Sequence, residues 1–132
     1  MSAPPKTVHR KKYVLIVDDE APIVDTLAVI LRRSGYDAVP AYDAMTALLL
    51  CRTACPDLVI SDVMMPAMNG IEMAIQVQEC CPGCKILLFS GMAASADLLE
   101  AARQSGHEFE LVSKPIHPTD LLVRLSAAGV SP

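Results

Sequence analysis

Five polar residues stand directly after short apolar runs, and their side chains are of the types that bind cations and phosphoryl groups. Asp18 and Asp19 follow the run YVLIV, and Asp62 follows LVIS. Ser90 follows KILLF, and Lys114 follows ELVS. If the fold brings the ends of these runs together, the carboxylates, the hydroxyl and the ammonium group would form a site for a divalent cation and an anionic ligand.

The three carboxylates would repel one another at close range and raise each other's pKa unless a cation neutralised them. Mg²⁺ suits an oxygen-only site, because it keeps much of its hydration shell and binds through one or two protein carboxylates. We therefore predict a Mg²⁺ site with Asp19 and Asp62 as direct ligands. Asp18 would act through a water molecule.

Asp62 is also the predicted nucleophile. Attack by its carboxylate on phosphorus would form an acyl phosphate. The phosphoryl donor is anionic, so positive charge is needed near the equatorial phosphoryl oxygens, and Mg²⁺ and Lys114 can supply it. The hydroxyl of Ser90 can donate a hydrogen bond to a further phosphoryl oxygen.

The elements that must position these residues alternate regularly along the chain. Apolar runs typical of buried strands are each followed by a stretch with apolar residues at helical spacing. The predicted strands cover residues 13–17, 36–42, 58–61, 85–89 and 109–113, and the predicted helices cover residues 22–33, 44–53, 71–79, 96–104 and 118–127. This alternation indicates an α/β fold, a doubly wound five-stranded parallel sheet with helices on both faces, in which the strand ends meet at one edge.

Composition favours one soluble domain. A length of 132 residues fits a single domain, and an apolar fraction of 52% is too high for a disordered segment. No apolar run approaches the roughly 20 residues that span a bilayer, and the basic start lacks the apolar region of a secretory signal, so we expect a cytoplasmic protein outside the membrane. The expected divisions are a flexible basic tail at 1–12, the domain at 13–128 and a short tail at 129–132.

Charge argues against nucleic-acid binding by the domain itself. The net charge is −4, but four of the eleven basic residues lie in the first twelve positions. In the rest of the chain seven basic residues stand against fifteen acidic ones. A surface of that sign repels phosphate backbones.

The five cysteines are expected to be reduced. Cytoplasmic thiols rarely pair, and an odd number cannot all pair within one chain, so we expect no disulfide. In the predicted fold they gather at the sheet edge opposite the carboxylates, and they are Cys51, Cys55, Cys80, Cys81 and Cys84. Buried or incidental thiols are the favoured interpretation, and a zinc site or a redox pair is the alternative.

Four motifs together resemble the receiver domains of response regulators, the CheY-like proteins of two-component signalling. They are VLIVDDE with Asp18 and Asp19, DLVISDVMMPAMNG with Asp62, LLFSG with Ser90, and the pair Lys114-Pro115. Each motif alone is weak evidence for the family, but four motifs in this order and at these spacings are specific to it. The similarity runs from residue 13 to residue 127.

The resemblance implies a fold, a partner and a mode of action. The fold is flavodoxin-like, with strand order 2-1-3-4-5. The function is that of a phosphoacceptor, phosphorylated on Asp62 by a sensor histidine kinase or a phosphotransfer protein, that works as a conformational switch and not as an enzyme. The backbone carbonyl of Met64 would complete the protein ligands of Mg²⁺, and the peptide bond between Lys114 and Pro115 would be cis.

The output of such a switch is open. The downstream protein partner is unidentified, and a phosphorylation-dependent homodimer is one form the output could take. No effector domain is recognisable, so the chain would act as a single-domain protein or as the receiver part of a larger response regulator.

Two positions depart from the pattern of the family. Leu111 stands three residues before the lysine, where an aromatic residue usually relays the signal, and Phe109 lies two residues earlier on the same face of the predicted strand. Met64 and Met92 follow Asp62 and Ser90 at the spacing of residues that tune loss of the phosphoryl group. Because both are apolar, we expect them to shield the acyl phosphate and not to activate water.

Three other functions are compatible with parts of the sequence. A small Mg²⁺-dependent phosphatase with an aspartate nucleophile would share the acidic edge, but Met64 stands where its second acid is needed. A flavin-binding electron carrier would share the fold, but the acidic residues after the first strand would repel its phosphate. A receiver-like docking module without phosphorylation chemistry is the third alternative.

Overall fold

Five strands and five helices alternate along the chain in the computed structural model, which describes residues 10–91, 95–107, 109–115 and 117–132. The strands are β1 (Tyr13–Val17), β2 (Asp37–Ala41), β3 (Leu58–Asp62), β4 (Lys85–Ser90) and β5 (Glu110–Ser113). The helices are α1 (Ala21–Arg33), α2 (Ala44–Thr53), α3 (Gly70–Cys80), α4 (Ser95–Gln104) and α5 (Pro118–Ala127).

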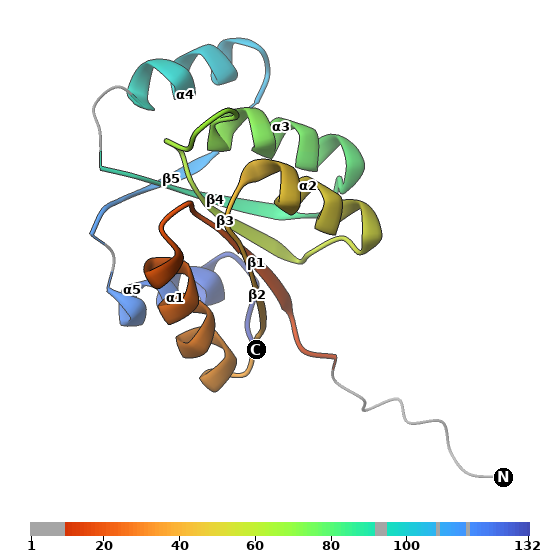
Figure 1. Cartoon of the computed structure of the whole chain (residues 1–132), viewed down its shortest axis with the longest axis vertical. Coiled ribbons are helices and arrows are strands. Elements are labelled where there is room, and N and C mark those ends of the chain that lie inside the picture. Colours follow the sequence, from red (N-terminus) through yellow and green to blue (C-terminus); the bar gives the residue numbers. More distant parts are fainter. Residues whose placement is uncertain (1–9, 92–94, 108, 116) are drawn as a thin grey trace, which may run out of the picture.

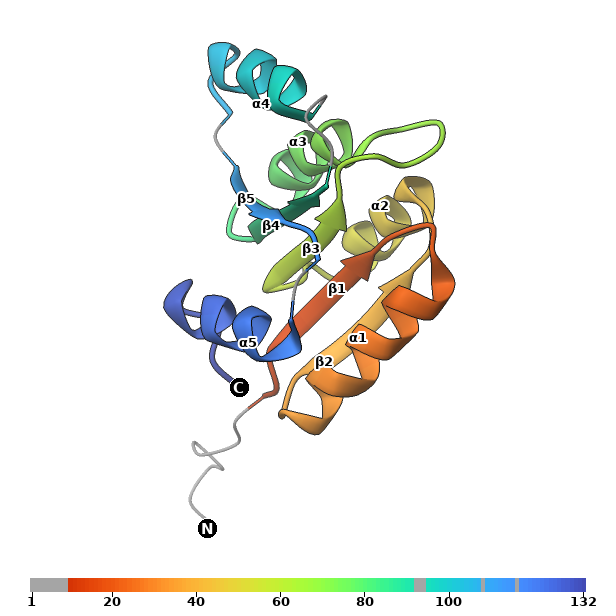
Figure 2. The same cartoon turned by 90° about the vertical axis from the view of Figure 1, so that its left-hand side faces the viewer.

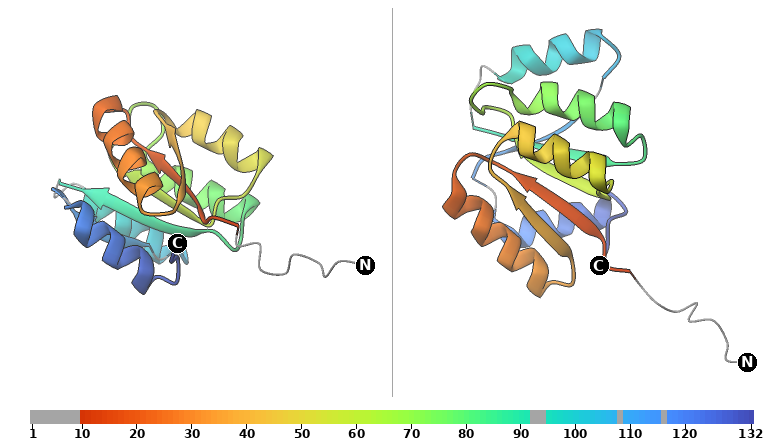
Figure 3. Two further views of the ribbon diagram at one scale, coloured as in Figure 1. Left: turned by 90° about the horizontal axis from the view of Figure 1, so that it is seen from below. Right: turned by 45° about the vertical axis from the view of Figure 1, so that its right-hand side comes forward.

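All strand pairs are parallel, and the strand order is β2-β1-β3-β4-β5, which confirms the predicted doubly wound sheet. Helices α1 and α5 cover one face of the sheet, and α2 and α3 cover the other (Figure 1). Figure 2 shows the strands side by side, from β5 at one end of the sheet to β2 at the other, with α4 above α3. The right-hand view of Figure 3 shows α2, α3 and α4 stacked along one face. The result is a three-layer α/β domain.

The central strand β3 is buried along its whole length. Its apolar residues explain this position, because a strand covered by helices on both faces needs apolar side chains on both faces. Strand β1 beside it is buried except at its first residue. These two strands carry the acidic residues at their ends, so the charged site stands at the end of two buried strands.

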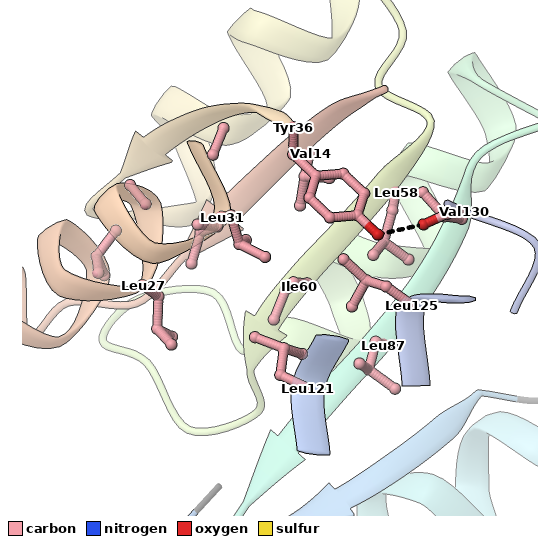
Figure 4. Packing of buried hydrophobic residues seen from close by; sticks show 14 of the residues in the cluster. Val14, Leu27, Leu31, Tyr36, Leu58, Ile60, Leu87, Leu121, Leu125 and Val130 are labelled. Carbon is pink, nitrogen blue, oxygen red and sulfur yellow. Dashed lines mark hydrogen bonds between the residues drawn. The ribbon is translucent and has the colours of Figure 1, made fainter. Parts of the chain in front are cut away.

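The layer between the sheet and helices α1 and α5 is a continuous apolar core (Figure 4). Leu31 of α1 and Leu125 of α5 pack with Ile60 of β3 in this cluster. The hydroxyl of Tyr36 donates a hydrogen bond of 2.6 Å to the backbone carbonyl of Val130, which ties the start of β2 to the C-terminal segment. The buried phenol is thereby satisfied, as buried polar groups require.

Helix α3 begins with a capping box. The Asn69 side chain accepts a hydrogen bond of 2.8 Å from the Glu72 backbone N–H, and the Glu72 carboxylate accepts one of 3.2 Å from the Asn69 backbone N–H. Such reciprocal bonds satisfy N–H groups that have no partner within the helix. They fix the N-cap of α3 at Asn69, seven residues after Asp62, so the loop between strand and helix has a defined end.

Candidate functional site

Four strand ends bring the predicted site residues to one edge of the sheet. Asp62 is the last residue of β3, and Ser90 is the last residue of β4. Asp18 comes directly after β1, and Lys114 comes directly after β5. Because parallel strands have their carboxyl ends at the same edge, four segments far apart in the sequence meet there.

Lys114 lies between two carboxylates. Its Nζ is 3.1 Å from Oδ2 of Asp62 and 3.6 Å from Oδ2 of Asp18. The two aspartates are buried, with residue exposures of 7% for Asp62 and 4% for Asp18. One ammonium group therefore faces two carboxylates at a site with little water, where charges interact more strongly than on the surface.

Asp18, Asp19 and Asp62 form an acidic cluster whose ligand oxygens lie within 4.8 Å of one another. Asp18 and Asp62 are buried, and Asp19 is exposed. The three carboxylates outnumber the one lysine among them, and all their donor atoms are oxygens. Such a set suits a hard divalent cation, so the cluster could hold a metal ion.

Local charges shift the pKa values at the site. Burial raises the pKa of Asp18, and the charge of Asp62 adds to the rise. The hydrogen bond from the Glu20 backbone N–H and the charge of Lys114 act against it. Burial would lower the pKa of Lys114, but its hydrogen bond to Asp62 and the charge of that carboxylate outweigh burial and raise it. The lysine is therefore a fixed positive charge at neutral pH.

Ser90 and Met64 are each hydrogen-bonded to a residue of the site. Ser90 is buried, and its backbone carbonyl accepts a hydrogen bond of 3.0 Å from the Lys114 backbone N–H, which joins the ends of β4 and β5. Met64 is 43% exposed, and its backbone N–H donates a bond of 3.4 Å to Oδ1 of Asp62. Met92, the second methionine singled out by its spacing, lies outside the described residues.

The peptide bond between Lys114 and Pro115 is cis, as the resemblance implied. The Lys114 backbone N–H is hydrogen-bonded to the Ser90 carbonyl at the end of β4. Because that backbone is held, the side chain can reach across to the carboxylates of the two central strands.

Gly70 positions the start of α3 against the end of β3. It closes the motif DLVISDVMMPAMNG, but the sequence alone assigned it no role. A Cβ atom on Gly70 would lie 2.1 Å from the backbone oxygen of Asp62 and 3.1 Å from Oγ of Ser61. The Gly70 backbone N–H donates a hydrogen bond of 2.8 Å to the carbonyl of Val63. Helix α3 thus begins directly against the end of β3, and only glycine permits that approach. The glycine eight residues after the aspartate was the available signal.

Leu111, at the position where the family has an aromatic residue, and Phe109 have different surroundings in the structure. Leu111 is on β5 and is 36% exposed. Phe109 precedes the strand, so the prediction that it begins β5 is wrong. Its ring stacks on that of His107, with centroids 6.3 Å apart, and it packs against the cluster around Ile71. The edge of the sheet therefore presents an aliphatic side chain at Leu111.

The expectation that all cysteines stay reduced is wrong, because Cys55 and Cys81 form a disulfide. The fold brings the segment after α2 next to the end of α3, with the two Cα atoms 5.6 Å apart, a separation that disulfides commonly span. Cys51, Cys80 and Cys84 are free. The predicted gathering of the cysteines at the amino-terminal edge of the sheet is confirmed, since Cys55 precedes β3 and Cys81 and Cys84 precede β4.

The family model of the response regulator receiver domain matches residues 14–126. Among curated proteins, the chain is 30% identical over 117 residues to the DNA-binding response regulator MtrA of Mycolicibacterium paratuberculosis, covering 89% of this chain and 51% of that protein. It is 35% identical over 119 residues to the alkaline phosphatase synthesis transcriptional regulatory protein PhoP of Bacillus subtilis, covering 88% of this chain and 48% of that protein. The chain spans about half the length of these curated relatives.

Solved structures of receiver proteins superpose closely on this chain. A CheY-like receiver domain protein from Methanospirillum hungatei superposes with a TM-score of 0.81 at 27% identity, covering 90% of this chain and 94% of that one. The chemotaxis response regulator CheY4 of Vibrio cholerae gives a TM-score of 0.76 at 28% identity, covering 89% and 98%. The chain belongs to the response regulator receiver domain family, whose members are signalling modules of two-component systems.

Among the described residues, no helix is long and apolar enough to cross a bilayer.

Proposed function

We propose that Asp62 of this receiver domain accepts a phosphoryl group from the phosphohistidine of a sensor histidine kinase or a phosphotransfer protein. The observation that carries the proposal is the position of Lys114, whose Nζ is within 3.6 Å of both Asp62 and Asp18 at the carboxyl edge of the sheet. A buried carboxylate beside a fixed ammonium group and an acidic metal cluster supports phosphoryl transfer.

The transfer forms one bond and breaks one. An oxygen of the Asp62 carboxylate forms a bond to phosphorus, the bond from phosphorus to the donor histidine nitrogen breaks, and the nitrogen keeps the electron pair. Lys114 stabilises charge on the phosphoryl oxygens, and Ser90 donates its hydroxyl to one of them. The product is an acyl phosphate on Asp62.

Mg²⁺ is the cation that we propose for the acidic cluster. Asp19 and Asp62 would bind it directly, the Met64 carbonyl would be a third protein ligand, and Asp18 would act through water. When bound, Mg²⁺ neutralises the carboxylates and the incoming phosphoryl oxygens. The excess of buried carboxylate over lysine charge supports a cation at this place.

The phosphorylated domain would then change its surface and bind a downstream partner, as a switch and not as a turnover enzyme. We propose that residues 13–128 form the receiver, that residues 1–12 and 129–132 are tails, and that the protein works in the cytoplasm. MtrA and PhoP are named as a DNA-binding and a transcriptional regulator. The phosphorylated receiver could act in three ways: through an effector joined to it, through a separate protein, or by forming a homodimer.

The test is phosphorylation by a small-molecule donor. The protein is incubated with acetyl phosphate and Mg²⁺, and its intact mass is measured over time. We expect the wild type to gain one phosphoryl group and Asp62→Asn to gain none. Omitting Mg²⁺ should abolish the gain in the wild type.

Asp37→Asn is the matched control. Asp37 begins β2 at the opposite edge of the sheet and is exposed, so the same chemical change there should leave phosphorylation at the wild-type rate. Equal phosphoryl gain in wild type and Asp62→Asn would refute the assigned acceptor. Many turnovers of a phosphomonoester would instead favour the phosphatase alternative.

A further inference from the structure

Three cysteines lie together at the amino-terminal edge of the sheet, away from the carboxylates. Cys55 is in the loop between α2 and β3, and Cys80 and Cys81 are at the end of α3. Cys55 and Cys81 are joined by a disulfide, and the Sγ of Cys80 is 3.5 Å from that of Cys81. Helices α2 and α3 run side by side on the same face of the sheet (Figure 1).

The two halves of the bridge differ in exposure. Cys55 is exposed, whereas Cys81 is 1% exposed and its sulfur contacts the backbone carbonyl of Cys51. Cys55 is therefore the side of the bridge that faces solvent, and Cys81 is the protected side. Accessibility of this kind is what distinguishes labile bridges from protected structural ones.

The free cysteines also divide into two kinds. Burial raises the pKa of Cys51 to about 11 and that of Cys84 to about 12, with smaller contributions from nearby negative charges. Burial therefore favours the protonated thiol at both positions, whereas the thiolate is the form that attacks a disulfide. Cys80 is exposed, so it is the free thiol that solvent and reagents can reach among those described.

We propose that Cys55 and Cys81 form a reversible thiol–disulfide exchange site that accepts an external thiol, either a low-molecular-weight thiol or a protein dithiol, at Cys55. The proposal rests on the cytoplasmic location given under the proposed function. In that compartment glutathione and thioredoxin reduce structural bridges, and the disulfides that form are usually transient and sense redox state.

A dithiol opens the bridge by thiol–disulfide exchange in two steps. The external thiolate attacks the Cys55 sulfur, a mixed disulfide forms, and Cys81 leaves as a thiolate and takes up a proton. The second thiolate of a dithiol reductant then attacks its own sulfur in the mixed disulfide, which releases Cys55 and leaves the reductant oxidised. Two electrons pass from the dithiol to the bridge. Oxidised glutathione restores the bridge: Cys55 attacks it and releases one glutathione, and Cys81 then attacks the resulting mixed disulfide and releases the second.

The bridge closes a segment of the chain that matters for function. Residues 55 and 81 enclose β3 and α3, so the covalent loop contains Asp62 and Gly70. Opening it frees the two ends of the unit that presents the phosphoacceptor. The redox state of the site would thus act on the same unit as phosphorylation, from the opposite edge of the sheet.

The test counts thiols in the full chain. The folded protein is equilibrated with oxidised glutathione or with dithiothreitol, quenched in acid, unfolded and alkylated with N-ethylmaleimide, and its intact mass is measured. Three adducts are expected after oxidation, on the free cysteines, and five after reduction. Peptide mapping should find the bridge between Cys55 and Cys81, and Cys81→Ser treated with oxidised glutathione should keep a glutathione adduct on Cys55, because the thiol that would displace it is absent.

Two matched variants locate the bridge. Cys55→Ser should show four adducts under both conditions, and Cys80→Ser should still lose two adducts on oxidation. Three results would each overturn the proposal. They are five adducts in the oxidised wild type, a bridge that opens only after unfolding, and the loss of two adducts on oxidation of Cys55→Ser. If Cys55→Ser fails to fold, the peptide map of the wild type decides. The count needs no phosphorylation, so its failure leaves the assignment of Asp62 untouched.

Discussion

Replacing Gly70 by alanine tests whether the start of α3 must touch the end of β3. The new Cβ would stand 2.1 Å from the Asp62 backbone oxygen, whereas ordinary contacts begin at 3.4 Å. The helix and the strand must therefore move apart by about 1 Å or more, a shift that the close packing of protein interiors resists. This movement would lengthen and weaken the hydrogen bond of 2.8 Å from the Gly70 backbone N–H to the Val63 carbonyl.

The magnitude follows from three contributions. Overpacking of this kind costs about 1–3 kcal/mol. A weakened buried hydrogen bond adds about 1 kcal/mol. Alanine regains about 0.5–1 kcal/mol through its lower conformational entropy in the unfolded chain. We expect Gly70→Ala to lower the free energy of unfolding by about 1–3.5 kcal/mol, which at this chain length is a fall in Tm of about 4–13 °C.

The assay is urea unfolding followed by circular dichroism, with Gly83→Ala as the matched control. A Cβ on Gly83 would have no neighbour within 4 Å, so the control should unfold within about 0.5 kcal/mol of the wild type. Gly70→Ala should also accept a phosphoryl group from acetyl phosphate more slowly than the control, because the displaced backbone carries Asp62. Equal stability of the two variants would refute the reasoning about the close approach.

Two further changes probe the framework around the site. Asp43→Ala removes the cap that accepts a 2.7 Å hydrogen bond from the Thr46 backbone N–H, and urea unfolding at pH 7 should show a loss of about 1 kcal/mol. Because that bond lowers the pKa of Asp43, the difference between variant and wild type should shrink as the pH falls through the folded-state value, and a constant difference would contradict this. Tyr36→Phe leaves the Val130 carbonyl unpaired and should cost about 1–2 kcal/mol, with unchanged thermal unfolding as the contrary result.

The secondary structure could be predicted closely because its signals are local. Apolar runs between breaks predicted all ten elements, and the differences lie at their ends. Helix α1 begins at Ala21, one residue before the predicted start, and β3 includes Asp62, so the nucleophile stands on the strand itself. Such shifts are expected where a helix or strand ends gradually.

The site could also be predicted in outline, since parallel strands bring their carboxyl ends to one edge. This topological rule placed Asp18, Asp62, Ser90 and Lys114 together without any knowledge of distances. It could not indicate that Lys114 would contact both aspartates, because that contact depends on how the β5 end is held to β4 and on the path of the lysine side chain.

The amino-acid sequence by itself therefore determined the order of the elements and the chemical groups at the strand ends, because both depend on neighbouring residues. Only the tertiary structure decided the close approach of Gly70 to Asp62, the contact of Lys114 with both aspartates and the pairing of Cys55 with Cys81. Each of these depends on how segments distant in sequence pack. The spacing of residues along the chain does not determine which distant residues come into contact, because the packing of helices on the sheet sets those distances.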